Sequence, residues 1–377
     1  MESAGLNRIV RAEDVAHMGI TEVIRHMPRV YGAYRRLVAS IKKHHPDVAI
    51  LIDFPDVNFR LASELKKLGV PVIYFVSPQL WAWKRGRLRW VQQRVDRMMV
   101  IFPFEARFYR ARGVDARFVG HPLAELPRPD ISRDEYAAAH GLDPAKEWIA
   151  LLPGSRWKEV TANIEVMVEM VQRFPPGCEY LLPVASTIDR KKLAQLIAGH
   201  EEWWPGDVGS AFRALNLHLV PDAREALYHA RASVVASGTA TVQAAVIGNP
   251  FVVVYRVSPL TFRLAKRLVR YPPEIWDPAQ VDADGNLPIA MVNLIAGRLV
   301  VPELLQNRFT PENVASALRP LLADGPQRRQ MIAALAEVRQ ALQPPPGTNS
   351  IQQVSNAVDA LLDEKRLDSG RKSTASV

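Results

Sequence analysis

Residues 151–159 read LLPGSRWKE, and residues 234–241 read VVASGTAT. Each segment begins as a short apolar run, typical of a buried strand, and breaks into Gly and Ser where a helix would start. A helix N-terminus has unpaired backbone N–H groups and about half a positive charge. Two such termini facing one cleft, with Arg156 beside the first, would bind a diphosphate. The two segments therefore predict an α/β fold with a nucleotide-sugar site.

Apolar runs alternate with segments of helical periodicity along most of the chain. The runs lie at 47–52, 71–76, 97–102, 148–152, 179–184, 215–220, 232–236 and 250–254. Helices are expected at about 21–43, 58–68, 103–112, 156–174, 187–198, 222–230, 238–247 and 258–270. This alternation is typical of doubly wound parallel sheets, whose strands are buried on both faces. A Pro-rich polar stretch at 121–134 is the candidate linker between two α/β halves.

The alternation ends after residue 270. Residues 271–288 are dense in Pro, Asp and Gly, which predicts a surface loop. Helical patterns resume at 300–306, 310–323, 327–342 and 349–365, and the final stretch is expected to be disordered.

Composition narrows the class of protein. The chain has 377 residues and 48% hydrophobic content, enough for two packed domains. Its one cysteine, Cys178, excludes an intramolecular disulfide framework and fits a reducing compartment. No apolar run reaches the roughly 18 residues of a membrane span, and the first residues lack the apolar core of a signal peptide, so we expect a cytoplasmic protein. The net charge of +9 predicts attraction to anions, whether nucleic acid, acidic lipid or phosphorylated substrate.

Asp53, in the segment IDFPDVNF at 52–59, follows a predicted strand. In open α/β sheets ligands bind at the carboxyl ends of the strands, so Asp53 could act as a general base, with Pro55 stiffening the turn. Alternatively, Asp53 or Asp56 caps the following helix. The sequence leaves both interpretations open.

Aromatic and basic side chains are interleaved in SPQLWAWKRGRLRW at 77–90, which contains Trp81, Trp83, Trp90, Lys84, Arg85, Arg87 and Arg89. This mixture suits a surface that contacts lipid headgroups or a phosphorylated glycolipid, and it would also suit single-stranded nucleic acid. The alternative is a pair of core tryptophans followed by a solvated basic helix. A second basic amphipathic segment, SPLTFRLAKRLVR at 258–270, favours the membrane surface. No nucleic-acid recognition motif is present, so no nucleic-acid partner is expected.

His121, in GHPL at 120–123, could bind a phosphate or a sugar hydroxyl, or it could be a structural histidine at the domain junction. The remaining histidines show no metal-ligand spacing, so no metal site is expected. The chain lacks GxxxxGK[ST], and no GxGxxG follows a strand, which argues against P-loop and dinucleotide-binding proteins.

Eight collinear segments between about residues 14 and 345 resemble the bacterial lipid-A-disaccharide synthase family: IDFPDVNF, VSPQLWAWKRGR, FPFE, VGHPL, LLPGSRWKEV, ASGTAT, VVVYRVSPLTFRLAKRLV and MVNLIAGRLVVPELLQ. The resemblance implies a GT-B glycosyltransferase, with two Rossmann-like doubly wound domains facing a cleft. It implies transfer of a diacylglucosaminyl unit from UDP-2,3-diacylglucosamine to the 6 hydroxyl of 2,3-diacylglucosamine 1-phosphate. The products would be the β(1′→6) lipid A disaccharide 1-phosphate and UDP. The implied enzyme is inverting, uses no metal or other cofactor, and is peripheral to the anionic cytoplasmic face of the inner membrane.

The resemblance also implies roles for particular residues. Asp53 would be the base that acts on the acceptor hydroxyl, and Arg156 would meet the UDP diphosphate. The UDP-sugar-binding set that it implies is Ser155, Arg156, Glu159, Ser237, Gly238, Thr239, Ala240, Gln243, Asn293 and Glu303. Gln243 stands where family members usually carry Glu, so it can form hydrogen bonds but supplies no charge. The set expected at the acceptor or lipid surface is Trp81, Trp83, Lys84, Arg85, Arg87 and His121.

Four segments are expected. Residues 1–125 would form the acceptor-side domain, 126–344 the UDP-sugar-binding domain, 345–365 a helix packing back on the N-terminal domain, and 366–377 a disordered tail. Relative to the family, the first domain is expected to be incomplete, because its first strand and a GExSGD-type loop are not found, and the loop at 272–288 to be longer. The alternative function is a catalytically impaired homologue that binds UDP or acidic lipid. The oligomeric state stays open between a monomer and a homodimer.

Overall fold

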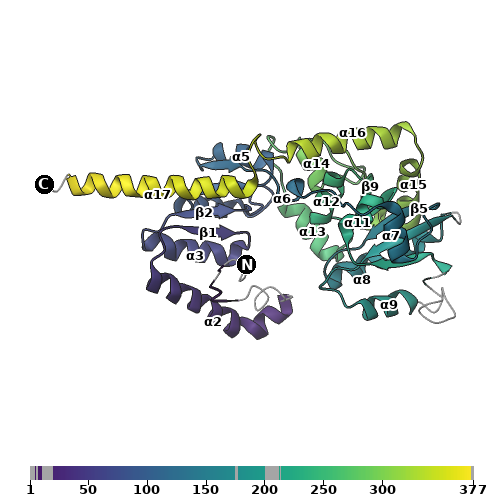
Figure 1. The fold of residues 1–377 in the computed structure, drawn as a ribbon, viewed down its shortest axis with the longest axis horizontal. Helices are drawn as coiled ribbons and strands as arrows, with labels where there is room; N and C mark the ends of the chain where they lie inside the picture. The colour runs from purple at the N-terminus through teal and green to yellow at the C-terminus, as the bar shows by residue number, and fades with distance from the viewer. Residues whose placement is uncertain are drawn as a thin grey trace. The chain divides into compact units, whose positions relative to one another are not determined.

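Two parallel sheets organise the chain in the computed structural model (Figure 1). The structure describes residues 5, 7–10, 20–174, 177–199, 212 and 214–374, with only the backbone described at 20–29 and 368–374. The chain divides into unit 1, residues 1–120 with 344–377, and unit 2, residues 121–343. Each unit contains one of the sheets, so two α/β domains are present, as the sequence predicts.

Unit 1 is built on a four-stranded parallel sheet with the order β1-β2-β3-β4. Its strands are β1 (Ala49–Ile52), β2 (Val72–Phe75), β3 (Arg97–Val100) and β4 (Ala116–Phe118). Its helices are α2 (Ile20–His44), α3 (Pro55–Lys67), η2 (Arg85–Arg87), α4 (Leu88–Arg94), α5 (Pro103–Arg110) and α17 (Ser350–Thr374).

The helices of unit 1 cover a sheet whose central strand β2 is buried throughout. Helix α3 packs against β1 and β2, and α5 packs against β3 and β4. Helix α17 lies beside β2, with Val354, Ala357 and Leu361 buried at helical spacing (Figure 1). Strand β1 is at the edge of the described sheet, and its side chains Ile50 and Ile52 are exposed.

Unit 2 contains a six-stranded parallel sheet. Its strands are β5 (Glu147–Leu152), β6 (Cys178–Pro183), β7 (Leu217–Val220), β8 (Ala232–Ala236), β9 (Phe251–Tyr255) and β10 (Glu303–Leu305). Its helices are α6 (Pro122–Glu125), α7 (Arg133–His140), α8 (Trp157–Val171), α9 (Arg190–Ala198), α11 (Ala223–His229), α12 (Thr239–Ile247), α13 (Pro259–Leu268), α14 (Met291–Ala296), η3 (Gln306–Arg308), α15 (Pro311–Leu322) and α16 (Pro326–Ala341).

The order of this second sheet is β10-β9-β8-β5-β6-β7. The chain therefore starts at β5, proceeds through β6 and β7 on one side, and then crosses over to β8, β9 and β10 on the other. Strands β5, β8 and β9 are mainly apolar, and all their residues except Glu147 and Tyr255 are buried, as expected of strands covered on both faces.

Four local expectations differ from the structure. Strand β4 was not expected from the sequence, because it is only three residues long. The helix predicted at 300–306 is wrong, because strand β10 lies there and pairs with β9. The segment 271–288 has no helix or strand, yet Tyr271 and Trp276 are buried in it, so it is packed onto the domain. The stretch 366–374, expected to be disordered, continues helix α17, and residues 375–377 lie outside the described residues.

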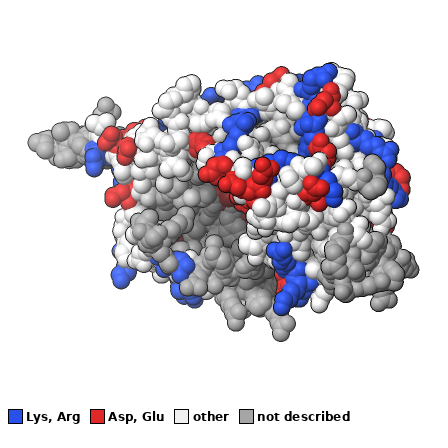
Figure 2. Space-filling model, turned by 45° about the vertical axis from the view of Figure 1, so that its right-hand side comes forward, with Lys and Arg blue, Asp and Glu red and all other residues white. Residues whose placement is uncertain are grey.

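The surface charge and the hydropathy of the helices bear on two classes of partner, nucleic acids and membranes. Figure 2 shows acidic and basic side chains interspersed over one face, so that face lacks the continuous basic stripe that follows a nucleic-acid backbone. Within the described ranges, no helix is long and apolar enough to cross a bilayer.

Candidate functional site

The point where the strand order reverses lies between β5 and β8. Leu152 of β5 is paired with Val235 of β8, so both strands end side by side at the same edge of the sheet. The GSR turn follows β5 and the SGT loop follows β8. In open α/β sheets this switch point opens a crevice at the carboxyl ends of the strands, where ligands bind. The topology thus brings together the two segments on which the nucleotide-site prediction depends.

The first loop, after β5, is folded around Glu159. Gly154 has a φ of +130°, and a Cβ at this position would lie 2.5 Å from the Glu159 Cβ. The Glu159 carboxylate accepts hydrogen bonds from the backbone N–H groups of Ser155 (3.1 Å) and Arg156 (3.3 Å). It also accepts one from Arg156 Nη1 (2.8 Å). An internal carboxylate therefore occupies the N–H groups that the sequence assigns to a diphosphate.

Arg156 remains accessible. Its side chain is 79% exposed, and it precedes the fifteen-residue helix α8, whose N-terminus favours anions. Thr187 Oγ1 donates to the Ser155 carbonyl (2.6 Å), and the buried Asn163 amide donates to the Pro153 carbonyl (2.8 Å). These bonds fix the loop from both ends, so Arg156 projects from a rigid turn.

The second loop, after β8, leaves its backbone donors available. Gly238 is the residue before α12, with a φ of +151°, and no side chain caps the helix. The backbone N–H groups of Thr239 and Ala240 have no acceptor among the described residues. Ser237 and Gln243, both half-buried, also form no side-chain hydrogen bond there. Backbone and side-chain donors at the start of α12 are thus free to bind an anion or a sugar hydroxyl.

Asn293 and Glu303 form a buried network behind the loop edge. Asn293 Nδ2 donates to the Val301 carbonyl (3.0 Å) and to Glu303 Oε1 (2.7 Å), while its Oδ1 accepts from the N–H groups of Val300 (2.7 Å) and Val301 (3.0 Å). Glu303 also accepts from the N–H groups of Ile289 and Ala290, and burial raises its pKa. Asn293 is fully buried and has all its hydrogen-bonding capacity in use. Asn293 and Glu303 together hold the backbone between residues 289 and 303.

Asp53 is held in place by its backbone while its side chain is free. Its N–H donates to the Phe75 carbonyl (3.0 Å), and its own carbonyl accepts from Tyr74 Oη (2.6 Å) and Asn58 Nδ2 (2.7 Å). The exposed carboxylate takes part in no hydrogen bond or ion pair within the described ranges. The residue before α3 is Phe54, and no side chain caps this helix, so the capping interpretation of Asp53 finds no support.

The backbone around Asp53 is strained. Asp53 and Phe54 have φ angles of 46° and 43°, and Val76, at the end of the neighbouring strand β2, has a φ of 62°. Left-handed backbone is unfavourable for residues with a side chain, above all for a β-branched one, and such residues gather at functional sites. Both strand ends are at the carboxyl edge of the sheet in unit 1, where ligands bind in this class of fold.

A buried carboxylate organises the loop that follows β2. Glu105, 1% exposed, lies in the first turn of α5 and accepts from Ser77 Oγ (2.7 Å), Trp81 Nε1 (2.9 Å) and the Phe102 N–H (3.3 Å). Burial raises its pKa to about 7. Sequence reasoning assigned no role to Glu105, which lies in the segment FPFE. One signal in the sequence could have indicated its role: Glu105 is at the third position of a helix that follows a strand, where a Glu side chain often bonds to the backbone at the helix start.

The expected lipid-surface residues divide into two groups. Trp81 is buried at 1% exposure and bonded to Glu105, so it belongs to the core and the expectation of a surface residue is corrected. Trp83 is 43% exposed, with Lys84 Nζ lying 4.1 Å from its ring centre. Arg85 is exposed, and Arg87 forms an ion pair with Asp56 (2.7 Å). Trp83, Lys84 and Arg85 are therefore the members that could meet a ligand.

His121 acts as a structural residue at the start of α6. Its Nδ1 accepts from the Leu123 N–H (3.1 Å), and its own N–H donates to the Leu342 carbonyl (2.8 Å). Burial lowers its pKa to about 4, so the imidazole is neutral near pH 7 and cannot bind a phosphate as a cation. Of the two interpretations left open by the sequence, the structure favours the structural histidine.

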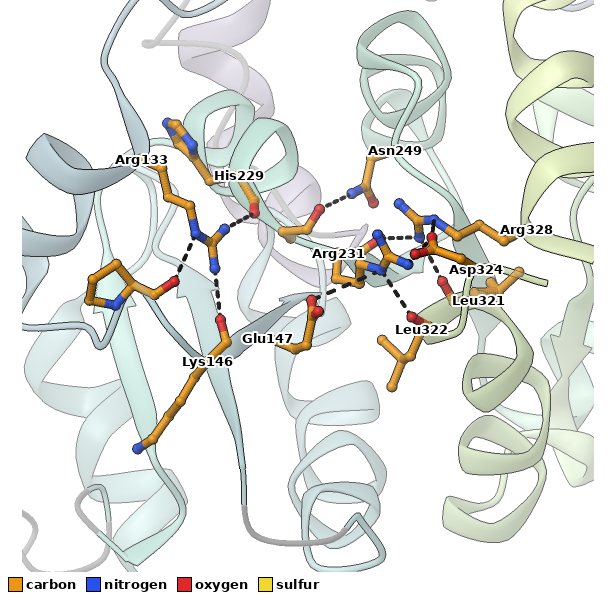
Figure 3. Close-up of polar contacts among 12 residues, drawn as sticks. Arg133, Lys146, Glu147, His229, Arg231, Asn249, Leu321, Leu322, Asp324 and Arg328 are labelled. Atoms are coloured by element: carbon orange, nitrogen blue, oxygen red, sulfur yellow. Dashed lines mark hydrogen bonds and ion pairs between the residues drawn. The ribbon is translucent and has the colours of Figure 1, made fainter.

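A hollow of about 400 Å³ lies where β5 and β8 begin, at the end of the strands opposite to the switch-point loops (Figure 3). Arg133 donates to the carbonyls of Pro144 (3.2 Å), Lys146 (2.7 Å) and His229 (3.1 Å). Arg231 donates to the Leu322 carbonyl (2.9 Å) and pairs with Asp324, while Arg328 donates to the Leu321 and Arg231 carbonyls.

These arginines neutralise the ends of helices. His229 ends α11, and Leu321 and Leu322 end α15, so the guanidinium groups meet the carbonyls and the negative dipole ends that helices leave unpaired. We therefore assign this hollow to the scaffold of unit 2. Over the ranges that the structure describes, no group of three or more His, Cys, Asp and Glu is placed to hold a metal ion.

Comparison with known proteins identifies the family. The family model described as Lipid-A-disaccharide synthetase matches residues 1–357. The chain belongs to the lipid-A-disaccharide synthase family. The lipid-A-disaccharide synthase of Acidobacterium capsulatum is 51% identical over 372 residues, which cover 97% of this chain and 88% of that protein. That of Koribacter versatilis is 48% identical over 343 residues, covering 91% and 83%.

Solved structures agree on the fold. The calicheamicin glycosyltransferase CalG4 is similar with a TM-score of 0.56 at 14% identity, covering 96% of this chain and 87% of that one. Staphylococcus aureus MnaA, solved with UDP, has a TM-score of 0.54 at 14% identity, covering 88% and 80%. The GT-B fold class predicted from the sequence is confirmed. As a member of the lipid-A-disaccharide synthase family, the chain is a hexosyltransferase of lipid A disaccharide synthesis.

Proposed function

We propose that unit 2 binds the UDP-sugar donor at the switch point between β5 and β8. The observation that carries this proposal is the pair of free N–H groups on Thr239 and Ala240, at the N-terminus of a nine-residue helix that begins at this crevice. Arg156 projects from the neighbouring turn and supplies a full positive charge. A diphosphate there would receive charge-assisted hydrogen bonds from Arg156 and dipolar stabilisation from α12.

Glu159 competes with the nucleotide in this proposal. Its carboxylate holds the Ser155 and Arg156 N–H groups and the Arg156 guanidinium. The diphosphate would share or take over Arg156, while Glu159 keeps the turn in shape through the backbone. Ser237 and Gln243 would donate to ribose or sugar hydroxyls, since both have hydrogen-bonding capacity to spare. Asn293 and Glu303 would support the loop edge without touching the donor.

The reaction proposed is displacement at the anomeric carbon of UDP-2,3-diacylglucosamine. Asp53 of unit 1 takes the proton of the 6 hydroxyl of 2,3-diacylglucosamine 1-phosphate. The hydroxyl oxygen then forms a bond to C1 on the face opposite the nucleotide, and the bond between C1 and the diphosphate oxygen breaks. The configuration at C1 inverts, giving the β(1′→6) disaccharide 1-phosphate. The charge that develops on the departing UDP is stabilised by Arg156 and the N-terminus of α12.

Both substrates carry acyl chains, which places the reaction at a bilayer surface in this proposal. We propose peripheral association with the anionic cytoplasmic face of the inner membrane, with Trp83, Lys84 and Arg85 of unit 1 near the acceptor. An exposed aromatic ring with adjacent cations suits the headgroup region.

Replacement of Asp53 tests the proposed mechanism. Asp53→Asn should bind UDP like the wild type while turnover falls by roughly 10²–10⁴, the range for loss of a general base. Asp56→Asn, three residues away and paired with Arg87, is the matched control and should keep most of its turnover. Disaccharide formation and UDP calorimetry are measured on the same preparations. Full turnover of Asp53→Asn would remove this residue as the base. If the wild-type protein binds UDP but forms no disaccharide, the alternative of a binding protein is supported.

A further inference from the structure

We propose that helix α13 (Pro259–Leu268) of unit 2 lies flat on an anionic bilayer surface through a stripe of three leucines. The inference rests on the proposed function, because it names the element by which the donor-binding unit meets the membrane. It is carried by the exposure of the helix, by its charge, and by its place in the sheet of unit 2.

The helix exposes its apolar side chains. None of its ten residues is buried. Leu260, Leu264 and Leu268 are 75%, 56% and 55% exposed, respectively. Residues four apart lie on one face of a helix, so the three side chains form one continuous stripe. Phe262 and Val269, half-buried on the opposite side, attach the segment to the domain. An aligned apolar stripe turned away from its own domain needs an apolar environment outside the domain.

The positive charges beside the leucine stripe favour an anionic bilayer over a second copy of this chain. Arg263, Lys266 and Arg267 are exposed, and α13 contains no acidic residue. Lys266 Nζ donates to the Asp284 carbonyl (2.7 Å), a contact that leaves its charge uncompensated. Arg263 and Arg267 form no ion pair with the described residues. A second copy docked stripe against stripe would bring these cations together, whereas anionic headgroups above an acyl layer complement both features.

The position of α13 connects it to the donor site. Helix α13 follows β9, whose neighbour β8 leads into the SGT loop, and Ser237 N–H donates to the Val254 carbonyl (3.0 Å). Strands β8 and β9 are parallel, so the helix and the proposed nucleotide loop leave the sheet of unit 2 at the same edge. A bilayer contacted by α13 therefore lies on the side of this unit where a donor with acyl chains would enter.

Sedimentation with vesicles tests the leucine stripe. The vesicles contain phosphatidylcholine with about one third phosphatidylglycerol, an anionic lipid. The variant Leu260→Ser, Leu264→Ser, Leu268→Ser should bind them about tenfold more weakly than the wild type, since three apolar side chains no longer enter the interface. Ile351→Ser with Leu367→Ser, 65% and 66% exposed on α17, is the matched control and should bind like the wild type. Equal binding of the leucine variant and the wild type would overturn the proposal.

Replacement of the basic residues tests the charge. Arg263→Gln, Lys266→Gln, Arg267→Gln should lose about fivefold in vesicle binding for each charge at low salt, and the loss should shrink as salt rises. Lys191→Gln, Lys192→Gln, Arg107→Gln, all exposed, controls for net charge. Equal binding to pure phosphatidylcholine vesicles would overturn the role of charge. Self-association of the wild type that the leucine variant alone abolishes would assign the stripe to a second copy instead.

UDP calorimetry on every variant separates this inference from the proposed function. Unchanged UDP affinity in the α13 variants shows that unit 2 remains folded. If the wild type binds vesicles through α13 but does not bind UDP, the donor-site proposal fails while the membrane inference stands. If the wild type binds UDP and the leucine variant keeps full vesicle binding, the membrane inference fails while the donor-site proposal stands.

Discussion

Glu105 should make the stability of unit 1 depend on pH. Its carboxylate is 1% exposed and accepts hydrogen bonds from Ser77, Trp81 and the Phe102 N–H. Among the residues that the structure describes, no cation is paired with it. Burial disfavours the charged form and raises the pKa from 4.5 to about 7. The folded protein therefore keeps a proton that the unfolded chain has already released, and the free energy of unfolding falls as the pH rises from about 4.5 through 7.

The size of the effect follows from this shift. One pKa unit corresponds to about 1.4 kcal/mol, so the wild type should lose about 3 kcal/mol of stability through Glu105 across this window. Glu105→Gln cannot titrate, so the unfolding free energy of the wild type minus that of the variant should fall by about 3 kcal/mol from pH 4.5 to 8. Urea unfolding followed by tryptophan fluorescence at several pH values measures this difference.

Asp359→Asn, an exposed carboxylate of α17 in the same unit, is the control and should show no such trend. The interpretation is wrong if the difference between wild type and Glu105→Gln stays constant across the window. That result would mean that the three hydrogen bonds offset the effect of burial, so that the pKa of Glu105 in the folded protein is close to its ordinary value.

Three further predictions concern unit 2. Gly154→Ala should destabilise the unit by about 1–3 kcal/mol, since the new Cβ meets Glu159 at 2.5 Å on left-handed backbone, and thermal unfolding measures this loss. Arg156→Ala should weaken UDP binding by about 1.5–3 kcal/mol, the scale of a charge-assisted hydrogen bond, and unchanged affinity in calorimetry would exclude the GSR turn from the site. Arg231→Met should cost about 1–3 kcal/mol of stability, because it frees the Leu322 carbonyl at the end of α15. Arg298→Met, which breaks an exposed pair, should cost under about 1 kcal/mol in urea unfolding, and equal losses would refute the helix-end role of Arg231.

The alternation of apolar runs and helical segments was sufficient to predict the two parallel sheets. Strands β5, β8 and β9 begin and end within a residue or two of their predicted positions, because each is a short, mainly apolar run of buried residues. Strands β4 and β10 escaped prediction because three residues are too few to form a periodic signal. The Pro-rich segment 271–288 shows that irregular backbone can be read from composition while burial of Trp276 cannot.

The candidate site was predictable as far as local motifs determine it. The GSR and SGT loops were placed at helix starts, and the strand order brings them to one edge of the sheet. The motifs do not predict which hydrogen-bond partner each side chain has in the folded protein. Glu159 fills the first loop, Asn293 is saturated by its own loop, and Trp81 turns inward to Glu105, and each outcome depends on the three-dimensional neighbourhood of a side chain.

The left-handed backbone at Asp53, Phe54 and Val76 has a consequence for protein engineering. Relief of such a conformation by glycine is worth roughly 1–2 kcal/mol per residue, so a library screened for melting temperature should enrich glycine at Phe54 and Val76. Glycine would also free the backbone that holds the Asp53 carboxylate in position. Selection for heat resistance and selection for turnover should then favour different residues at these two positions, and thermostable variants obtained in this way should be slow enzymes.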